Sequence, residues 1–585
     1  MKYILLTILL INSTFATSLD TNTTNIQDTN TSTVIDYHSH IKSYFTKRKA
    51  IGVNIQKSLL RKYYKKWKYE PIWFEEDGTL NPISNELIRF AKNDKVISDK
   101  SKKFYNLKRI DELISKYENE SLTTKETLQL DFLLTNLYDN YISNIAKGSI
   151  NWKEFQEYLE ELHEEDDIVA NWEKYKARVN KYKLLKNTLI NNDINISINS
   201  VNYTYPNANK LYSKLLEYEE VQKNGGYIKV PSVRRSLKVG MKSKVVPILK
   251  KRLIQSNDYI VEDTNTTLVS DNNTTIKTPN NIYTKKLSNA VKNFQRNHGL
   301  YVDGICGRDT IRHLNISVKH KIDQIKVNLE RMRWMKRDLG DEYLLVNIPD
   351  YNLRYYSDNK EQLKLSVIVG TKKHPTPIFS HRLSTVVLNP YWRVPERIAQ
   401  REIVPKLIDN PNYLDNKDMN IHPDWNIKSE TIEPTDINWT QFAQNEEQKE
   451  KKIYPELPYR FIQVPGDKNP LGKMKFLFRN KYMVYIHDTN TRDFFKRRKR
   501  AFSHGCIRLH NPHKLLATIE EKEKALDPIK DKEILEGIEQ TEFSLNKKIP
   551  IHIIYLTTWV DDNNNIQFRD DIYGYDKVQR DILYK

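Results

Sequence analysis

Cysteine is nearly absent from this chain, with two residues in 585, at positions 306 and 506. A protein held together by disulfides carries more of them, so we expect packed cores instead. Glycine (16 residues) and proline (22 residues) are also scarce, which excludes a collagen-like or low-complexity chain. After the amino-terminal segment, no apolar run reaches the roughly 20 residues that a membrane-spanning helix needs. We therefore expect no transmembrane segment.

Charge, in contrast, is abundant. Charged residues make up 29% and hydrophobic residues 38% of the sequence, which is typical of a folded globular protein. At about 100 to 200 residues per domain, the length predicts two to four domains. The formal net charge of +19 predicts an anionic partner of one of three kinds: nucleic acid, anionic lipid or a carboxylate-rich polymer.

The amino terminus reduces the number of possible anionic partners. After Met1 and Lys2, an apolar run extends from Tyr3 to Ile11 and is followed by polar residues and the small Ala16. This pattern predicts a secretory signal peptide over residues 1–16, because a run of about nine apolar residues is too short for a membrane anchor. Residues 17–36 are rich in Thr, Asn and Asp and predict a flexible lead-in. Because we expect the protein to be exported, we do not expect nucleic acid to be its partner.

Residues 37–230 have a mostly helical pattern and predict an all-helical domain. Leu128, Phe132, Leu133 and Leu137 place apolar side chains on one helix face, and residues 121–126 just before them supply capping residues. The charged, heptad-like segment from Trp152 to Tyr182 predicts a solvated helix surface. The role of this domain's surface stays open.

Residues 236–317 predict a compact helical module with a surface loop inserted at 262–278. Apolar residues recur at helical spacing before a turn that contains Cys306, which we expect to be buried, unpaired and structural. The module resembles the peptidoglycan-binding domain of many wall hydrolases and transpeptidases; a generic three-helix bundle is the alternative. The residues that carry this resemblance are Ala290 to Leu300, Asp303, Gly304, Gly307 and Thr310.

The inserted loop contains two sequences that fit the acidic-extended glycosylation acceptor of some bacteria. The acceptor asparagines would be Asn265 and Asn273. A solvated polar loop without glycans is the alternative interpretation.

Residues 318–338 predict a connecting helix, after which strand patterns dominate residues 340–585. Short β-prone runs at Tyr343 to Ile348, Leu353 to Tyr356 and Leu363 to Gly370 indicate a meander. The β pattern stops at residues 395–448, which predict an inserted, partly helical lid, and resumes at Tyr459. The fold class is therefore multidomain α+β: a helical domain, a small helical module and a mainly-β domain with a lid.

The mainly-β domain contains a histidine and a cysteine that suit nucleophilic catalysis. Alternation over Tyr482 to His487 points Tyr485 and His487 to the same face of a strand. Cys506 follows 19 positions later (506 minus 487), enough chain to return a thiol beside the imidazole. A histidine that accepts the thiol proton gives a thiolate able to attack a carbonyl, and Gly505 would let backbone amides approach the oxyanion.

A basic run, residues 496–500, directly precedes this cysteine, and Arg508 follows it. We expect these charges to stabilise a thiolate and to attract a carboxylated substrate; a solvated basic face is the alternative. Asp488 follows the histidine, but on a strand its side chain would point away from the imidazole, so we interpret it as a turn residue.

The pattern of His487 followed by Ser503-His504-Gly505-Cys506-Ile507-Arg508 resembles the active-site signature of the L,D-transpeptidase family, the YkuD-type catalytic domain. The resemblance implies Cys506 as the acyl-accepting nucleophile and His487 as the base, oriented by a backbone carbonyl. It assigns Ser503, His504, Gly505, Arg508 and Tyr485 to the substrate pocket. Residues 389–395, 465–472 and 559–576 look like the large Gram-negative subgroup, which has a helical scaffold, a wall-binding domain and a capping lid. Trp392 and Arg393 then line a substrate groove.

The resemblance implies a periplasmic enzyme that acts on peptidoglycan stem peptides and glycan strands without a metal or other cofactor. Cys506 would release the terminal D-alanine of a tetrapeptide stem and pass the acyl group to an amine, giving a 3→3 cross-link. Water as the acceptor would make an L,D-carboxypeptidase, and a protein lysine an anchoring enzyme. Two further hypotheses are a non-catalytic wall-binding protein and a secreted cysteine protease. The sequence favours a monomer without deciding the oligomeric state.

Overall fold

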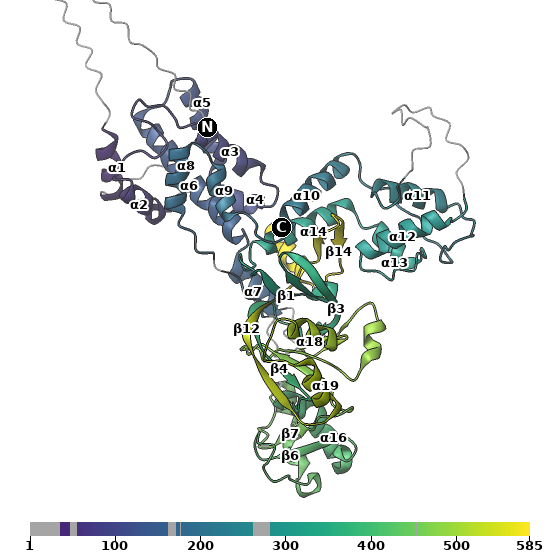
Figure 1. The fold of residues 1–585 in the computed structure, drawn as a ribbon. Coiled ribbons are helices and arrows are strands. Elements are labelled where there is room, and N and C mark those ends of the chain that lie inside the picture. The colour runs from purple at the N-terminus through teal and green to yellow at the C-terminus, as the bar shows by residue number, and fades with distance from the viewer. Residues whose placement is uncertain are drawn as a thin grey trace, which may run out of the picture.

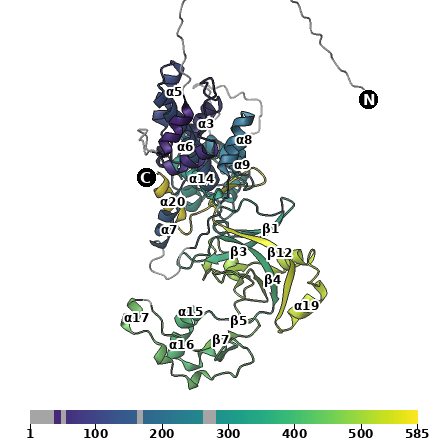
Figure 2. The ribbon, with the colours of Figure 1, turned by 90° about the vertical axis from the view of Figure 1, so that its left-hand side faces the viewer.

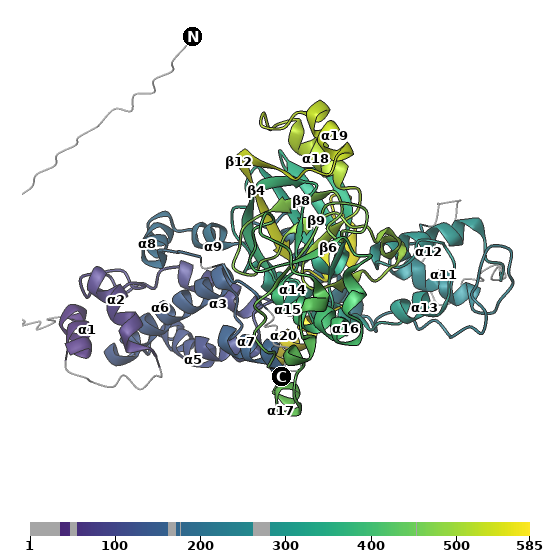
Figure 3. The ribbon, with the colours of Figure 1, turned by 90° about the horizontal axis from the view of Figure 1, so that it is seen from below.

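A computed structural model describes residues 36–46, 55–161, 171–175, 177–260, 281–451 and 453–584. The predicted signal peptide, nearly all of the predicted lead-in and the loop with Asn265 and Asn273 lie outside the described residues. A helical region and a smaller helical module lie on opposite sides of a β-rich region, as both Figure 1 and Figure 3 show. This arrangement confirms the multidomain α+β fold class.

The amino-terminal region is helical, as predicted. Its longest helix begins with a capping box, in which the hydroxyl of Thr123 accepts from the amide of Glu126 while the carboxylate of Glu126 accepts from the amide of Thr123. Phe132, Leu133 and Leu137 are fully buried in its core. The helices are α1 (Tyr37–Thr46), α2 (Lys57–Lys66), α3 (Ile83–Asn93), α4 (Asp99–Lys102), α5 (Leu107–Glu118), α6 (Thr124–Lys147), α7 (Trp152–Glu161), α8 (Lys181–Asn191), α9 (Asn195–Val201) and α10 (Ala208–Lys223).

The prediction of a solvated helix surface from Trp152 to Tyr182 is wrong for Phe155 and Trp172, which are buried, while residues 162–170 and 176 lie outside the described residues. Helix α7 ends at Glu161, and Trp172 forms a parallel bridge with Ile378 of the β-rich region. The rings of Trp172 and Trp334 lie 5.4 Å apart, between centroids, in an edge-to-face arrangement. The tryptophans and Phe155 bury their apolar area against the β-rich core, a long-range contact that heptad spacing does not reveal.

The second module packs three helices, α11 (Val246–Gln255), α12 (Lys285–Asn297) and α13 (Arg308–Leu314), around one core. Cys306 is fully buried there, unpaired, and its backbone pairs with Leu237. Burial raises the pKa of its thiol to about 12, so this cysteine is inert, as predicted.

Helix α14 (Val318–Met332) connects this module to the β-rich region and packs on α10. Leu215, Ile325 and Leu329 share a core with Trp559 from the far end of the chain. The helix ends six residues before the predicted 338, and the chain then turns so that Trp334 enters the core.

The β-rich region contains a nine-stranded sheet in the order β10-β3-β11-β9-β8-β4-β12-β1-β2. Because β2 also pairs with β3, all strands except β10 form a closed ring around a buried apolar core. The strands are β1 (Glu342–Asn347), β2 (Asn352–Ser357), β3 (Lys360–Gly370), β4 (Phe379–Leu388), β8 (Met474–Leu477), β9 (Ile486–His487), β10 (Ala501–Ser503), β11 (Ile507–Leu509) and β12 (Thr541–Ile554).

The expected meander is confirmed, since β1, β2 and β3 pair antiparallel in chain order. Strand β12, from the end of the chain, inserts in parallel beside β1, and β9 and β11 are also parallel. Helices α18 (Pro512–Glu520), α19 (Pro528–Glu536) and α20 (Tyr575–Tyr584) and the two-stranded sheet of β13 (Thr558–Val560) and β14 (Ile566–Phe568) complete the region.

Residues 392–463, which we call the lid, form a separate lobe below the ring in Figure 2. They have their own hydrophobic core, which runs from Val394 to Phe461 and so extends past residue 448. A small sheet of β5 (Trp392–Arg393), β7 (Arg460–Gln463) and β6 (Met419–His422) closes the lobe. Its helices include α15 (Glu396–Ile398), the π-helix Ala399–Ile403, α16 (Val404–Asp409) and α17 (Glu446–Glu450).

Candidate active site

Cys506 directly precedes β11, and His487 lies on the neighbouring parallel strand β9. Ile507 is in register with Ile486, and Arg508 with His487, so β11 and β9 run side by side. Side chains alternate along strands, and paired residues point the same way. Cys506, immediately before β11, therefore shares a sheet face with Arg508, Tyr485 and His487. Ile507 and Ile486 point into the core on the other face and are fully buried.

Hydrogen bonds hold the loop that carries Cys506. The hydroxyl of Ser503 donates to the carbonyl of Cys506 at 2.6 Å and accepts from the amide of Gly505 at 3.3 Å. The hydroxyl of Thr376 donates to the carbonyl of Gly505 and accepts from the amide of Gly370, both at 2.8 Å. Gly505 has φ +112°, a conformation that side chains rarely adopt, which explains glycine there.

Tyr573 braces the same loop from the end of the chain. Its hydroxyl donates to the carbonyl of Gly370 at 2.8 Å and accepts from the amide of Thr376 at 3.2 Å. The ring of Tyr573 is fully buried. Sequence reasoning did not identify Thr376 or Tyr573, because both reach the loop only through tertiary contacts.

His487 is held as a neutral base. Its Nδ1 lies 2.5 Å from the carbonyl oxygen of Asp488, which fixes the proton on Nδ1 and leaves Nε2 as an acceptor. Desolvation, with the charge of Arg508 adding to it, lowers the pKa of His487 to about 3. The imidazole is therefore neutral, and able to accept a proton, across the physiological range.

The side chain of Asp488 has a structural task. Its carboxylate accepts from the amide of Lys473 at 2.9 Å and pairs with Arg492 at 2.9 Å. The backbone carbonyl, not the carboxylate, contacts the imidazole. The interpretation of Asp488 as a residue whose side chain points away from His487 agrees with this geometry.

Cys506 is half-buried, and desolvation raises the pKa of its thiol. Hydrogen bonding by Tyr485 and the charges of Lys475 and Arg508 act in the opposite direction and favour the thiolate. Tyr485 is close to both catalytic candidates, since its ring centroid lies 5.5 Å from that of His487. The resting group is thus a thiol beside a neutral base, with cations in place to stabilise the thiolate.

Lys475 is the residue at this face that sequence reasoning missed. It pairs with His487 across β8 and β9, and its ammonium lies 4.0 Å from the ring centroid of Tyr485. Burial lowers the pKa of Lys475, while the charge of Cys506 opposes that shift. No pattern in the sequence distinguishes Lys475, because it reaches His487 only through the pairing of β8 with β9.

The basic run is not among the groups that act most on the thiol of Cys506, and its expected attraction of a carboxylated substrate stays a prediction. Arg498 pairs with Asp570 at 3.0 Å, and Arg500 donates to the carbonyl of Tyr351 at 2.8 Å. The charges that act on Cys506 come from Lys475 and Arg508 instead. The run lies against the small helical module, where the amide of Arg498 donates to the hydroxyl of Tyr301 at 3.0 Å.

The remaining predicted residues connect the site to the lid. His504 is exposed, and its Nε2 lies 2.9 Å from the carboxylate of Glu402, on the π-helix of the lid. That hydrogen bond lowers the pKa of Glu402. Arg393 is exposed on β5, and its charge acts on Lys475, whereas Trp392 packs partly against the core of the lid.

Among the described residues, neither a metal-binding cluster nor a membrane-spanning helix is found. None of their His, Cys, Asp and Glu side chains gather in groups of three or more that could hold a metal ion. None of their helices combines the length and the apolar character that crossing a membrane requires.

Comparison with known proteins adds three family matches. Residues 341–525 match the model of the L,D-transpeptidase catalytic domain, and residues 58–215 match the model of the scaffold domain. Residues 245–314 match the model described as "Putative peptidoglycan binding domain". A Haemophilus influenzae protein named "Putative L,D-transpeptidase" is 34% identical over 234 residues, which cover 40% of this chain and 44% of that protein. The match thus spans less than half of that relative.

L,D-transpeptidases are among the solved structures that match this chain at low identity, as two of them illustrate. An L,D-transpeptidase from Stackebrandtia nassauensis is 13% identical, with 55% of this chain and 96% of that chain covered and a TM-score of 0.20. One from Mycobacterium smegmatis is 12% identical, with 37% and 58% covered and a TM-score of 0.16. From the family matches, the chain combines, in order, a scaffold domain, a peptidoglycan-binding domain and an L,D-transpeptidase catalytic domain.

Proposed function

We propose that this protein is an exported peptidoglycan L,D-transpeptidase that forms 3→3 cross-links through an acyl-enzyme on Cys506. The single observation that supports this best is the shared sheet face of Cys506, His487 and the cation Lys475. A thiol, a neutral base and a cation for the thiolate are the parts that cysteine acyl transfer needs. The family match over residues 341–525 adds the reaction class.

In the first half-reaction, Nε2 of His487 takes the thiol proton and Sγ of Cys506 attacks the carbonyl of the third residue of a tetrapeptide stem. The bond to the terminal D-alanine breaks, and the imidazolium returns the proton to the departing amine. The amide of Cys506 has no acceptor among the described residues, and so it is free to donate to the oxyanion.

In the second half-reaction, the side-chain amine of a neighbouring stem attacks the thioester. His487 accepts a proton from that amine, an amide forms, and Cys506 leaves as a thiol. The buried setting of His487 and the packing of the loop by Ser503 and Thr376 keep both groups in place for the two steps. The sites of action would be the periplasm and the wall, with stem peptides and glycan strands as partners.

Purified protein incubated with tetrapeptide muropeptides tests the proposal, with products read by mass spectrometry and Cys506→Ala as the control. We expect dimers that have lost one D-alanine, and no reaction in the variant. Tripeptides without dimers would instead identify an L,D-carboxypeptidase. Unchanged muropeptides with intact wall binding would indicate a non-catalytic wall-binding protein, and cleavage of casein-like peptides a protease.

A further inference from the structure

A groove lies between the peptidoglycan-binding module and the catalytic domain. We call it the interdomain groove; its cavity measures about 260 Å³, and its lining includes residues 299–302, 349–352, 495–500 and 569–570. One wall is the turn after α12, and the other contains the basic run of residues 496–500. The sequence predicts that this run stabilises the thiolate and attracts a carboxylated substrate, and its place in the groove concerns the second role.

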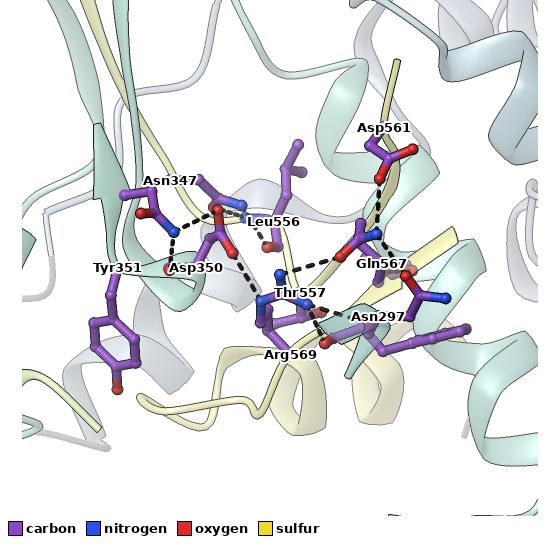
Figure 4. Close-up of polar contacts among 12 residues, drawn as sticks. Asn297, Asn347, Asp350, Tyr351, Leu556, Thr557, Asp561, Gln567 and Arg569 are labelled. Carbon is purple, nitrogen blue, oxygen red and sulfur yellow. Dashed lines mark hydrogen bonds and ion pairs between the residues drawn. The ribbon is translucent and has the colours of Figure 1, made fainter. Parts of the chain in front are cut away.

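Direct bonds fix the two walls relative to each other. The hydroxyl of Tyr301 accepts from the amide of Arg498 at 3.0 Å and lies 3.4 Å from the carbonyl of Lys496. Arg569 donates to the carbonyl of Asn297 at 3.2 Å and to the carboxylate of Asp350 at 2.8 Å, as Figure 4 shows. The groove is therefore a formed feature of the structure.

The lining carries an excess of positive charge that the protein itself does not neutralise. Both of its carboxylates are occupied: Asp350 pairs with Arg354 and Arg569, and Asp570 pairs with Arg498 and His313. Two exposed cations, Arg497 and Lys499, lack a carboxylate partner among the described residues, whereas Arg500 donates to the backbone carbonyls of Val367, Arg497 and Tyr351. A ligand with carboxylate groups would supply the missing partners.

Apolar surface lies next to these cations. Tyr301 is 57% and Val302 45% exposed at the edge of the groove. An exposed ring beside cations suits a ligand that combines a sugar face or an aliphatic chain with carboxylates, and a bare inorganic anion would use only half of this surface.

We propose that the interdomain groove binds the carboxylate-bearing peptide stem of a peptidoglycan strand and presents that strand to Cys506. This inference rests on the proposed function for the identity of the polymer. The chain from Arg500 to Cys506 spans six residues (506 minus 500), so the two sites lie at most about 22 Å apart. One strand is long enough to contact both sites.

Binding without turnover tests this proposal, in the Cys506→Ala background. The probes are a fluorescent disaccharide-tetrapeptide with free carboxylates and a neutral chitooligosaccharide, titrated at low and at physiological salt. The groove variant is Arg497→Gln/Lys499→Gln. The matched control is Lys108→Gln/Lys125→Gln, which removes the same charge from exposed positions on the helical region.

We expect the groove variant to bind the stem-bearing probe about tenfold more weakly, with a shallower salt dependence, because two charge-assisted contacts are lost. The control and the neutral probe should be unaffected. Equal affinity of the groove and control variants would overturn the proposal. Heparin or DNA competing as well as the stem peptide would also overturn it, since the groove would then be a general polyanion site.

The outcome is independent of catalysis. If muropeptide turnover fails but the groove variant still loses binding, the proposed function falls and the groove assignment stands. If turnover succeeds but binding is unchanged, only the groove assignment falls.

Discussion

Replacing Thr376 by valine removes the hydroxyl that joins two loops beneath Cys506 while preserving the shape of the side chain. That hydroxyl makes two hydrogen bonds of 2.8 Å, to the carbonyl of Gly505 and from the amide of Gly370, and Thr376 is almost fully buried. Each buried backbone group left without a partner costs about 1 to 3 kcal/mol, so the local cost is about 2 to 6 kcal/mol.

The lower end of that range already has a measurable effect. If the loop moves to recover its hydrogen bonds, a cost of about 2 kcal/mol lowers the population of the reactive conformation about 30-fold, at about 1.4 kcal/mol per factor of ten. We expect single-turnover acylation of Cys506 by a tetrapeptide fragment, followed by intact mass, to slow by at least about tenfold. Hydrogen exchange of peptides that contain Gly505 should become faster.

Thr376→Ser is the matched control. It keeps the hydroxyl and loses one methyl group, which is worth about 0.8 kcal/mol of burial, so acylation should stay close to that of the unmodified protein. If the valine variant acylates as fast as the serine variant and its loop exchanges no faster, the argument that this hydroxyl positions Cys506 is refuted.

Four further predictions concern the charge beside Cys506, the protonation of His487, the lid and a tight turn. Lys475→Met should raise the pKa of the Cys506 thiol, since an ammonium that favours the thiolate is lost. The pH at which alkylation of Cys506 accelerates should therefore be higher than in the unmodified protein. His487, with a pKa of about 3, should stay neutral between pH 5 and 8. Its protonation should therefore not lower the rate of acylation in this pH range. Glu402→Gln weakens the contact of the lid with His504 and should speed hydrogen exchange at residues 399–403. The urea midpoint should not change, because a pair between half-exposed side chains contributes little to stability. Gly472→Ala should lower the free energy of unfolding in urea by about 1 to 3 kcal/mol, because φ at this position is +59° and the new Cβ would collide with the buried carboxylate of Asp488.

The sequence predicted those features that depend on local pattern. The apolar face and the capping box of α6 lie within one helix, so spacing and residue type were sufficient. The same is true of the alternation that places Tyr485 and His487 on one face, although β9 covers only Ile486–His487 and the residues before it are not in a strand. The pairing of His487 with Cys506 came from the resemblance, and its catalytic role remains a proposal.

The features that the sequence did not predict all depend on pairings over long distances in the chain. Thr376 and Tyr573 meet at Gly370 from positions 197 residues apart, and no local pattern specifies that contact. The basic run lies beside Tyr301 because two domains dock, which also needs the tertiary structure. The sequence around Trp172 has the pattern of a charged helix, and only the tertiary structure shows that Trp172 packs on Trp334.

The most direct test of the central claim is intact-mass spectrometry of the protein mixed rapidly with a tetrapeptide muropeptide, followed by peptide mapping. The account predicts a transient adduct equal to the muropeptide less one D-alanine, located on Cys506 and absent from Cys506→Ala. The adduct should disappear when an acceptor amine is added. Turnover that persists in Cys506→Ala, or an adduct located on another residue, would contradict it.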